Sequence, residues 1–336
     1  MAKWFNDDGF QNDIVLSTRI RLARNLKGIA FPGKMTDADA VKVIERVEEA
    51  LEEMNYTFTK ININEADEGE KRRLVEEHWI SPALAKAKHA CAVYISEDEN
   101  VSIMVNEEDH IRIQCIYAGF EDRKAYELIS RIDDYLSEKL DFAVHEKYGY
   151  LTSCLTNVGT GMRISYMLHL PAIACSSVAE SIFSSITKLG ATVRGFYGEG
   201  TKSSGHIYQI SNQFTLGKDE SEIISNLNET ANSIIAKERE MRTDFYNKNG
   251  YTLEDRIMRS HAILKAARIL PTREMLDRMS DVRFGVGLGL IEGIDYKTLS
   301  NLMITASPAH ISIDGNEMTA VERDVRRAAL VREALG

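Results

Sequence analysis

The sequence predicts an α+β domain followed by a domain built of helices alone. The main observation is a change of pattern near residue 219. Before this point, segments with strand-like alternation are interspersed with segments of helical periodicity. After it, only helical patterns occur. The second observation is size, because a chain of 336 residues is long enough for two domains of about 150 residues each. We place these domains at residues 13–245 and 250–336.

The first expected element is a strand at residues 15–22, where apolar and polar side chains alternate. Residues 37–54 have the periodicity of a helix with one charged face. Apolar runs at 90–96 and 100–105, separated by the acidic turn Glu97-Asp98-Glu99, predict a pair of strands. The remaining predicted elements of this domain are a strand at 110–116, a helix at 123–140, and strands at 191–197 and 206–214.

The second domain reads as a series of helices separated by Gly and Pro. The expected helices span residues 219–246, 253–269, 272–284, 296–304 and 319–335. The segment Gly285-Val-Gly-Leu-Gly289 has the spacing of a nucleotide-binding loop, but no strand–turn–helix pattern surrounds it. We therefore interpret it as the end of a helix and a turn.

Composition limits the kinds of partner and compartment. The chain has 51 acidic and 41 basic residues and a formal charge of −10, which disfavours nucleic acid or an anionic membrane and favours a cationic partner. The cysteines form no CxxC pair and predict neither a zinc site nor a disulfide framework; they are Cys91, Cys115, Cys154 and Cys175. No signal sequence and no apolar run of about 20 residues is present. We expect a cytoplasmic protein.

Five arginines lie at the edges of expected strands or turns: Arg19, Arg21, Arg112, Arg163 and Arg194. In a strand, Arg19 and Arg21 project from one face while Ile20 projects from the other. Each arginine alone fits an ordinary surface ion pair. Five permanently charged, planar donors on one side of a sheet instead favour a polyanion, and a triphosphate suits such a cluster.

Two acidic segments are candidates for binding a phosphate acceptor, namely residues 106–110 and Glu199. A pair of carboxylates suits a guanidinium, which is cationic and must lose a proton before it can attack phosphorus. Taken alone, residues 106–109 also fit a solvated turn. The chain has no Walker motif and no HRD or DFG motif, so the common kinase architectures are excluded.

Four segments together resemble the phosphagen (guanidino) kinase family. They are Ser17-Thr-Arg-Ile-Arg-Leu-Ala-Arg24, Asn106-Glu-Glu-Asp-His-Ile-Arg112, Leu151-Thr-Ser-Cys-Leu-Thr-Asn-Val-Gly-Thr-Gly-Met-Arg163 and Arg194-Gly-Phe-Tyr-Gly-Glu199. They occur in the family's order and span roughly residues 13–245. The resemblance implies a curved antiparallel sheet backed by helices, and ATP as the phosphate donor. It also implies Mg²⁺ that is held by the phosphates and water rather than by protein side chains.

The resemblance also assigns site residues. Those that match the ATP-binding positions are Ser17, Arg19, Arg21, His78, Arg112, Arg163 and Arg194. Glu108 and Glu199 match the pair that binds the guanidinium, with Glu108 as the base, and Cys154 matches a cysteine that orients it. A lone His78 also fits a helix surface, and Cys154 a small buried side chain. The family usually has proline after this cysteine, whereas this chain has Leu155.

Three features resemble the members of the family that act on arginine residues of proteins. The first motif begins at Ser17, without the helical domain that precedes it in the small-molecule kinases, so the acceptor site is expected to be open. The loop at residues 198–205 is similar as well. Near the C-terminus, Arg323-Asp-Val-Arg-Arg-Ala328 resembles a motif of a phosphoarginine-binding pocket.

On a helix, Arg323, Arg326 and Arg327 share a face that can hold a phosphate, and Asp324 can meet the guanidinium. Ala328 completes this motif. An ordinary charged helix face is the alternative interpretation.

We therefore predict an ATP-dependent kinase of arginine residues in proteins. The alternatives are a kinase of free arginine or another small guanidine, and a non-catalytic phosphoarginine-binding adaptor. The resemblance further implies that modified proteins are marked for a Clp-type chaperone–protease and that a stress-gene repressor is controlled. It also implies a zinc-binding activator, allosteric regulation, and a homodimer formed by residues after about 250.

Overall fold

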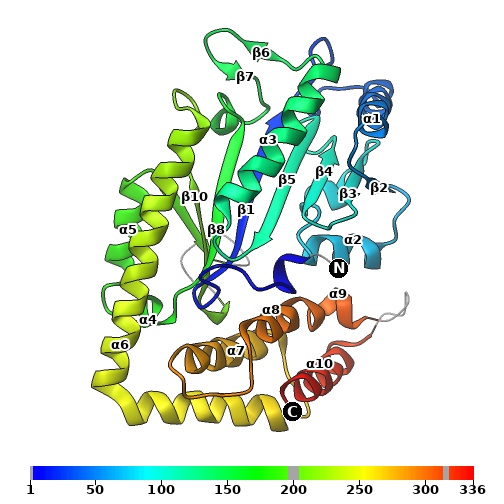
Figure 1. The fold of residues 1–336 in the computed structure, drawn as a ribbon. Helices are drawn as coiled ribbons and strands as arrows, with labels where there is room; N and C mark the ends of the chain where they lie inside the picture. The colour runs from blue at the N-terminus through cyan, green and yellow to red at the C-terminus, as the bar shows by residue number, and fades with distance from the viewer. Residues whose placement is uncertain (1–2, 196–203, 313–317) are drawn as a thin grey trace.

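The computed structural model describes residues 3–195, 204–312 and 318–336. Its centre is an eight-stranded sheet in the order β2-β3-β4-β5-β1-β8-β10-β9, with every neighbouring pair antiparallel (Figure 1). Its strands are β1 (Val15–Arg24), β2 (Phe58–Asn62), β3 (Ala92–Ser96), β4 (Val101–Val105), β5 (Ile111–Ala118), β8 (Met162–His169), β9 (Ala191–Gly195) and β10 (Ile207–Asn212). The short strands β6 (Val144–His145) and β7 (Gly149–Tyr150) form a separate hairpin.

Helices cover the sheet and then form a separate layer below it in Figure 1. Those of the first part are α1 (Asp37–Glu52), α2 (Glu68–Glu76), α3 (Asp122–Lys139), α4 (Pro171–Ala174) and α5 (Ala179–Lys188). The long helix α6 (Glu220–Ala266) leads into the second part, which contains α7 (Thr272–Gly287), α8 (Tyr296–Thr305), α9 (Pro308–Ile311) and α10 (Ala320–Leu335). Short 3₁₀ turns are η1 (Lys3–Phe5), η2 (Leu84–Lys86), η3 (Leu155–Asn157) and η4 (Ser204–His206).

The predicted fold class is confirmed: an antiparallel sheet backed by helices precedes a helical region. The two helices predicted at residues 219–246 and 253–269 correspond to the two halves of α6, which a kink separates; the second half ends at Ala266. The helix bends at Asn249, whose backbone (φ −127°, ψ 22°) is not helical. It continues beyond the bend because buried Leu253 and Ile257 pack in the core shared with α7.

Some elements were not predicted, among them β2, β8, α2 and α5. Helix α2 buries only Leu74, so it lacks the apolar stripe from which helical periodicity is recognised. The interpretation of residues 285–289 is confirmed, since α7 ends at Gly287 and Gly289 turns the chain with φ +70°.

The two faces of the sheet differ in what covers them. One face packs against α1, α3 and the first half of α6 (Figure 1). Ile20, Leu22 and Ile113 belong to the core between them. On the other face Met104 and Met167 pack in a second core with η1, α7, α8 and α10. Because side chains alternate along a strand, β1 places Arg19 and Arg21 on this second face, whereas Arg24 lies on the first.

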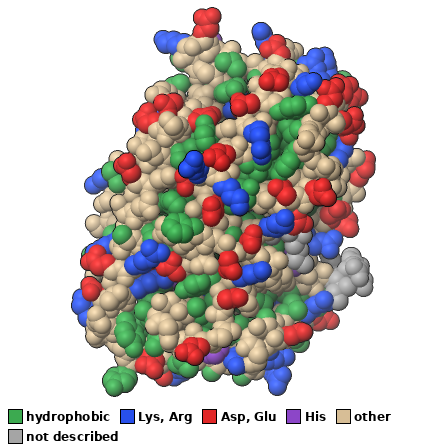
Figure 2. Space-filling model, in the orientation of Figure 1, with side chains coloured by type: hydrophobic (Ala, Val, Ile, Leu, Met, Phe, Trp, Pro, Cys, Tyr) green, Lys and Arg blue, Asp and Glu red, His purple; other side chains and the backbone are tan. Residues whose placement is uncertain are grey.

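Figure 2 shows the molecule in the orientation of Figure 1, from the side that α3 and α6 cover. Acidic and basic side chains are interspersed over most of this face, and acidic ones gather over α1. Among the described residues, no helix is both long and apolar enough to cross a membrane.

Candidate active site

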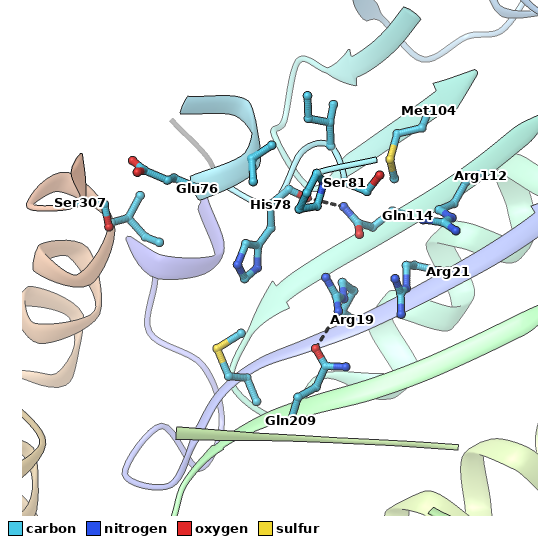
Figure 3. A pocket seen from close by; sticks show the side chains of 15 residues that line it. Arg19, Arg21, Glu76, His78, Ser81, Met104, Arg112, Gln114, Gln209 and Ser307 are labelled. Atoms are coloured by element: carbon cyan, nitrogen blue, oxygen red, sulfur yellow. Dashed lines mark hydrogen bonds between the residues drawn. The ribbon is translucent and has the colours of Figure 1, made fainter. Parts of the chain in front are cut away.

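A cavity of about 420 Å³ lies on the arginine-bearing face of the sheet (Figure 3). The sheet contributes Arg19, Arg21, Met104, Arg112, Gln114, Met167 and Gln209 to its lining. The end of α2 and the turn after it contribute Val75, Glu76, His78, Ile80, Ser81 and Pro82. The helical second part contributes Ile304 and Ser307, so both parts of the chain form the walls of this cavity.

The antiparallel register brings four of the predicted arginines together. Arg21 lies opposite Arg163 on β8 and opposite Gln114 on β5, and Arg112 is two residues before Gln114. Figure 3 shows Arg19, Arg21 and Arg112 side by side on their strands. The fifth arginine, Arg194, is exposed near the end of β9.

The electrostatics of this cluster are those of a site for an anion. Burial lowers the pKa of Arg19 to about 10, and Arg112 and Arg163 contribute to the lowering. The pKa of Arg21 is also well below its ordinary value, again through burial first and then through the neighbouring arginines. Arg19 donates to Gln209 Oε1 over 2.7 Å. Within the described part of the chain, the buried Nε of Arg21 has no hydrogen-bond partner.

The other predicted ATP-binding residues occupy two different environments. Ser17 is on the same strand as the arginines, but it is only 4% exposed and does not line the cavity. His78 lines the cavity with a left-handed backbone (φ +65°) and stacks on Trp4 with ring centroids 5.1 Å apart. Burial, reinforced by Arg19 and Arg21, lowers the pKa of His78 to about 3. Its ring is therefore neutral at physiological pH.

The acidic segment at residues 106–110 is largely internal, which excludes the interpretation as a solvated turn. The Glu107 side chain is 4% exposed, and its Oε2 lies 2.8 Å from Arg112 Nη2. Asp109 is fully buried. Glu108 points outward, with 45% of its side chain exposed, and its Oε2 is 3.2 Å from the same nitrogen of Arg112. Burial raises the pKa of Glu108; Arg112 opposes this, while Asp109 and Glu107 add to it.

Asp109 connects this turn to the loop that carries Cys154. Its Oδ1 accepts hydrogen bonds from Asn25 Nδ2 (2.7 Å) and from the backbone N–H of Ser153 (2.6 Å). The Cys154 Sγ lies 3.1 Å from the Thr156 hydroxyl. The loop then forms the turn η3, and Leu155, in the position where the family usually has proline, is 85% exposed. The structure thus places Glu108 and Cys154 on two turns that Asp109 ties together.

Sequence reasoning did not assign roles to Glu107, Asp109 and Asn25. No local signal distinguishes the two acidic residues from a solvated turn, because their burial depends on contacts with Asn25, Ser81 and Ser153, which are distant along the chain. Glu199 and residues 198–203 of the predicted loop lie outside the described residues.

The last arginine of the first motif has a structural role. Arg24 is fully buried and donates from Nε and Nη2 to the two carboxylate oxygens of Asp133, over 2.9 and 2.7 Å. Its Nη1 donates to the carbonyls of Ala23 and Thr160. Arg24 therefore fixes the end of β1 to α3 and is not part of the cavity.

The C-terminal motif lies on α10, where its arginines do not share one environment. Arg327 is 1% exposed and donates to the carbonyls of Ala306 and Leu270 and to Asp324. Arg323 donates to the carbonyl of Met318, and Arg326 is half-buried. Ala328 is buried in the core. Of the three arginines that we expected to share one face, Arg323 and Arg326 are therefore partly exposed, while Arg327 points inward.

Comparison with known proteins is consistent with this geometry. Residues 42–241 match the family model "ATP:guanido phosphotransferase, C-terminal catalytic domain". A solved lombricine kinase is similar in fold, with a TM-score of 0.64 at 23% identity over 70% of this chain and 69% of that one. A duplicated taurocyamine kinase from Schistosoma mansoni has a TM-score of 0.63, with 23% identity over 82% of this chain and 41% of that one. The fold and the family match are those of a guanidino phosphotransferase.

The match is closer to one branch of this class. Residues 250–336 match the model "Protein-arginine kinase McsB C-terminal domain". A protein-arginine kinase of Bacillus subtilis (strain 168) is 44% identical over all of this chain and 93% of its own length. One of Moorella thermoacetica is 45% identical over 99% of this chain and 97% of its own length. The chain belongs to the protein-arginine kinase family.

Proposed function

We propose that this chain transfers the γ-phosphate of ATP to the guanidinium of arginine residues in proteins. The observation that carries the proposal is the cluster of half-buried Arg19, Arg21 and Arg112 around a cavity, with the Nε of Arg21 unpaired in the described part of the chain. A polyphosphate supplies the negative charge that this cluster lacks. Family membership supports ATP as that polyphosphate.

In this proposal Arg19, Arg21, Arg112, Arg163 and Arg194 bind the phosphates, and His78 contacts the nucleotide. Mg²⁺ bound to the phosphates and water would supply further neutralisation of charge on the transferred group. The Arg112 side chain joins the two halves of the site, because it lines the cavity and also contacts Glu108. Ser17 is too deeply buried to touch a ligand directly and is better suited to supporting β1.

The acceptor guanidinium would bind beside Glu108 and Cys154, with Glu199 as the second carboxylate. A nitrogen of the guanidinium attacks the γ-phosphorus, so that an N–P bond forms while the bond from phosphorus to the β,γ-bridging oxygen breaks and ADP leaves. Glu108 accepts the proton that this nitrogen loses. Its raised pKa suits it to this role, because a more basic carboxylate takes up the proton more readily. Asp109 and Glu107 hold the two turns in place.

The exposure of this side of the site favours an arginine within a polypeptide. Leu155 is 85% exposed and Glu108 is 45% exposed on its side chain, so a chain segment can approach both. Free arginine or another small guanidine is the second candidate acceptor. An adaptor without activity is disfavoured because the sequence retains Glu108, Glu199, Cys154 and all five arginines of the family's motifs.

The test is phosphoarginine formation with Mg-ATP, comparing free L-arginine and an arginine-rich protein by ³¹P NMR at neutral pH. We expect label on the protein and a loss of about 10²-fold or more in turnover for Glu108→Gln. Glu127→Gln serves as the matched control, since Glu127 is 66% exposed on α3. Equal labelling of free arginine would favour the second candidate, and full activity of Glu108→Gln would remove Glu108 as the base.

We further propose that residues 13–245 and 250–336 act as a phosphotransferase domain and a regulatory domain. Arg323, Asp324 and Arg326 on α10 would bind phosphoarginine, with Arg327 orienting Asp324. Exposed apolar side chains support a homodimer through the second domain: Tyr251, Met258, Ile269, Val321 and Val325. Light scattering at micromolar concentration tests the dimer, and calorimetric titration with phosphoarginine tests the pocket.

The remaining proposals rest on family membership. They are a cytoplasmic location, a zinc-binding activator protein, a Clp-type chaperone–protease that degrades the modified proteins, and a stress-gene repressor as a substrate. Reconstitution with purified candidates tests each: the repressor should become phosphorylated on arginine, and the protease should degrade it only after that reaction. Degradation without phosphorylation would contradict the marking role.

A further inference from the structure

A second cluster of reactive side chains lies at the other end of β8 from Arg163. Cys175 follows α4, and its Sγ is 3.8 Å from His206 Nε2 and 3.9 Å from Arg256 Nη1. The thiol is thus flanked by an imidazole and a guanidinium that come from different elements, η4 and α6. Neither the proposed phosphotransfer nor the C-terminal motif uses these residues.

Each partner of the thiol is fixed by further contacts. Arg256 Nη2 lies 2.6 Å from Asp281 Oδ1 on α7, and Asp281 also accepts from Ser260 over 2.7 Å. The carbonyl of His206 accepts the backbone N–H of Leu170. On the other side of the cysteine, the backbone N–H groups of α4 donate to the buried carboxylate of Glu238, which caps this helix. The cluster is therefore a built arrangement rather than a chance approach of flexible side chains.

Cys175 is exposed, which distinguishes it from two other cysteines of the chain. The hydrogen bond with His206 lowers the pKa of Cys175; burial opposes this, and Arg256 adds to the lowering. Burial instead raises the pKa of Cys91 to about 11 and raises that of Cys115. An accessible thiol with a lowered pKa beside an imidazole and a guanidinium is the usual setting of a reactive cysteine.

The position of His206 connects this thiol to the nucleotide cavity. His206 directly precedes β10, and Gln209 on β10 lines the cavity and accepts the hydrogen bond of Arg19. The adjacent Gly205 packs closely against α7. A Cβ added at Gly205 would lie 2.9 Å from the Leu276 carbonyl oxygen. This close contact leaves η4 little room to move toward α7.

We propose that Cys175 is a site of reversible S-thiolation by low-molecular-weight disulfides, and that its modification weakens nucleotide binding through His206 and β10. In the reaction the Cys175 thiolate attacks one sulfur of the disulfide. A new S–S bond forms, the original S–S bond breaks, and the second sulfur leaves as a thiolate that takes up a proton. Cys175 is oxidised and the departing half is reduced. A reducing thiol reverses the step.

The first experiment measures modification of the full-length chain by glutathione disulfide at pH 7, followed residue by residue with peptide mass spectrometry. We expect Cys175 to react at least about fivefold faster than Cys91 and Cys115. His206→Gln should slow the reaction at Cys175 several-fold, whereas His261→Gln, on α6 and not in contact with Cys175, should leave it unchanged. No modification of Cys175 under conditions that modify Cys154 would overturn the proposal.

The second experiment measures the affinity for a non-hydrolysable ATP analogue by calorimetric titration before and after this treatment. We expect the Kd to rise about threefold or more, to recover with dithiothreitol, and to stay constant in treated Cys175→Ser. An equal rise in Cys175→Ser would assign the effect to Cys154, and an unchanged Kd after full modification would rule out the link through β10. Because neither readout requires turnover, a wrong acceptor assignment does not affect them.

Discussion

Arg21 and Arg24 lie three residues apart on β1 and have opposite surroundings. Arg24 is fully buried and makes four hydrogen bonds, two of them to the carboxylate of Asp133. Arg21 is surrounded by other arginines, and its Nε is unpaired in the described part of the chain. A buried charge with all its partners in the chain stabilises the fold, whereas a buried charge among like charges is kept for a ligand.

The same contrast exists in the helical part. Arg327 on α10 resembles Arg24, because its donors are used by two carbonyls and Asp324. Arg326, one residue earlier, is half-buried. In both places the sequence shows two similar arginines, and the contacts decide which of them supports the structure.

The largest expected effect is that of Arg24→Ala on stability. Removing this side chain leaves Asp133 without its ionic partner, and its carboxylate is 11% exposed. We expect the free energy of unfolding to fall by about 3–5 kcal/mol. Chemical denaturation followed by circular dichroism measures this. Wild-type stability combined with lost activity would place Arg24 with the ligand-binding arginines instead.

Arg21→Ala should have the opposite profile. We expect turnover to fall about 10²–10³-fold, because one donor to the transferred phosphate is lost. The free energy of unfolding should be unchanged or higher, since burial and three neighbouring arginines disfavour the charge of Arg21. Steady-state kinetics and denaturation on the same preparation provide the comparison. A loss of stability similar to that of Arg24→Ala would contradict it.

His310 is a third charge with all its partners inside the chain. Its Nδ1 is 3.0 Å from Glu76 Oε2 and its Nε2 is 2.9 Å from Glu77 Oε1, which joins α9 to the end of α2. Burial disfavours the charged ring, but the two carboxylates outweigh it and raise the pKa of His310 to about 9. Because folding raises this pKa, the folded state favours the protonated ring. The contribution of His310 to stability is therefore complete below pH 6.5 and is lost as the pH rises through 9.

We therefore expect His310→Gln to be less stable than the wild type by about 1–3 kcal/mol at pH 6. The difference should shrink as the pH approaches 10, because glutamine preserves a hydrogen-bonding group but carries no charge. Urea denaturation of both proteins at several pH values measures this. A difference that is independent of pH would show that charge is not the cause.

A smaller effect is expected at Gln209, the neutral partner of Arg19. Gln209→Leu removes one hydrogen bond to a charged group, worth about 1.5 kcal/mol, so the KM for ATP should rise about tenfold while kcat stays close to that of the wild type. Initial rates over a range of ATP concentrations separate the two constants. An equal fall in kcat would indicate that Arg19 acts only in the transition state.

Arg123→Ala is the control and should have the smallest effect. Its guanidinium is 90% exposed and pairs with Glu127 one helical turn away. Such pairs contribute about 0.5 kcal/mol or less. Denaturation and activity should both match the wild type. A larger loss would mean that exposure is a poor guide to the role of an arginine in this chain.

Much of the fold could be predicted from local patterns. Alternation placed Arg19 and Arg21 on one face of β1, and the change of pattern near residue 219 separated the sheet from the helices. The break predicted between residues 246 and 253 corresponds to the kink of α6, because Asn249-Gly250 interrupts the helical pattern there. Helix α2 escaped prediction, since a helix with a single buried side chain has no periodicity to detect.

The sequence by itself determined which residue types were available to the site and which of them share a face of a strand. Tertiary structure decided their partners: Asp133 for Arg24, Glu107 for Arg112, and a cavity wall completed by Ile304 and Ser307 from the second part of the chain. The physical reason is distance along the chain. Periodicity reports the direction of a side chain from its near neighbours, whereas Arg24 and Asp133 are 109 residues apart and meet only when the sheet and α3 have packed.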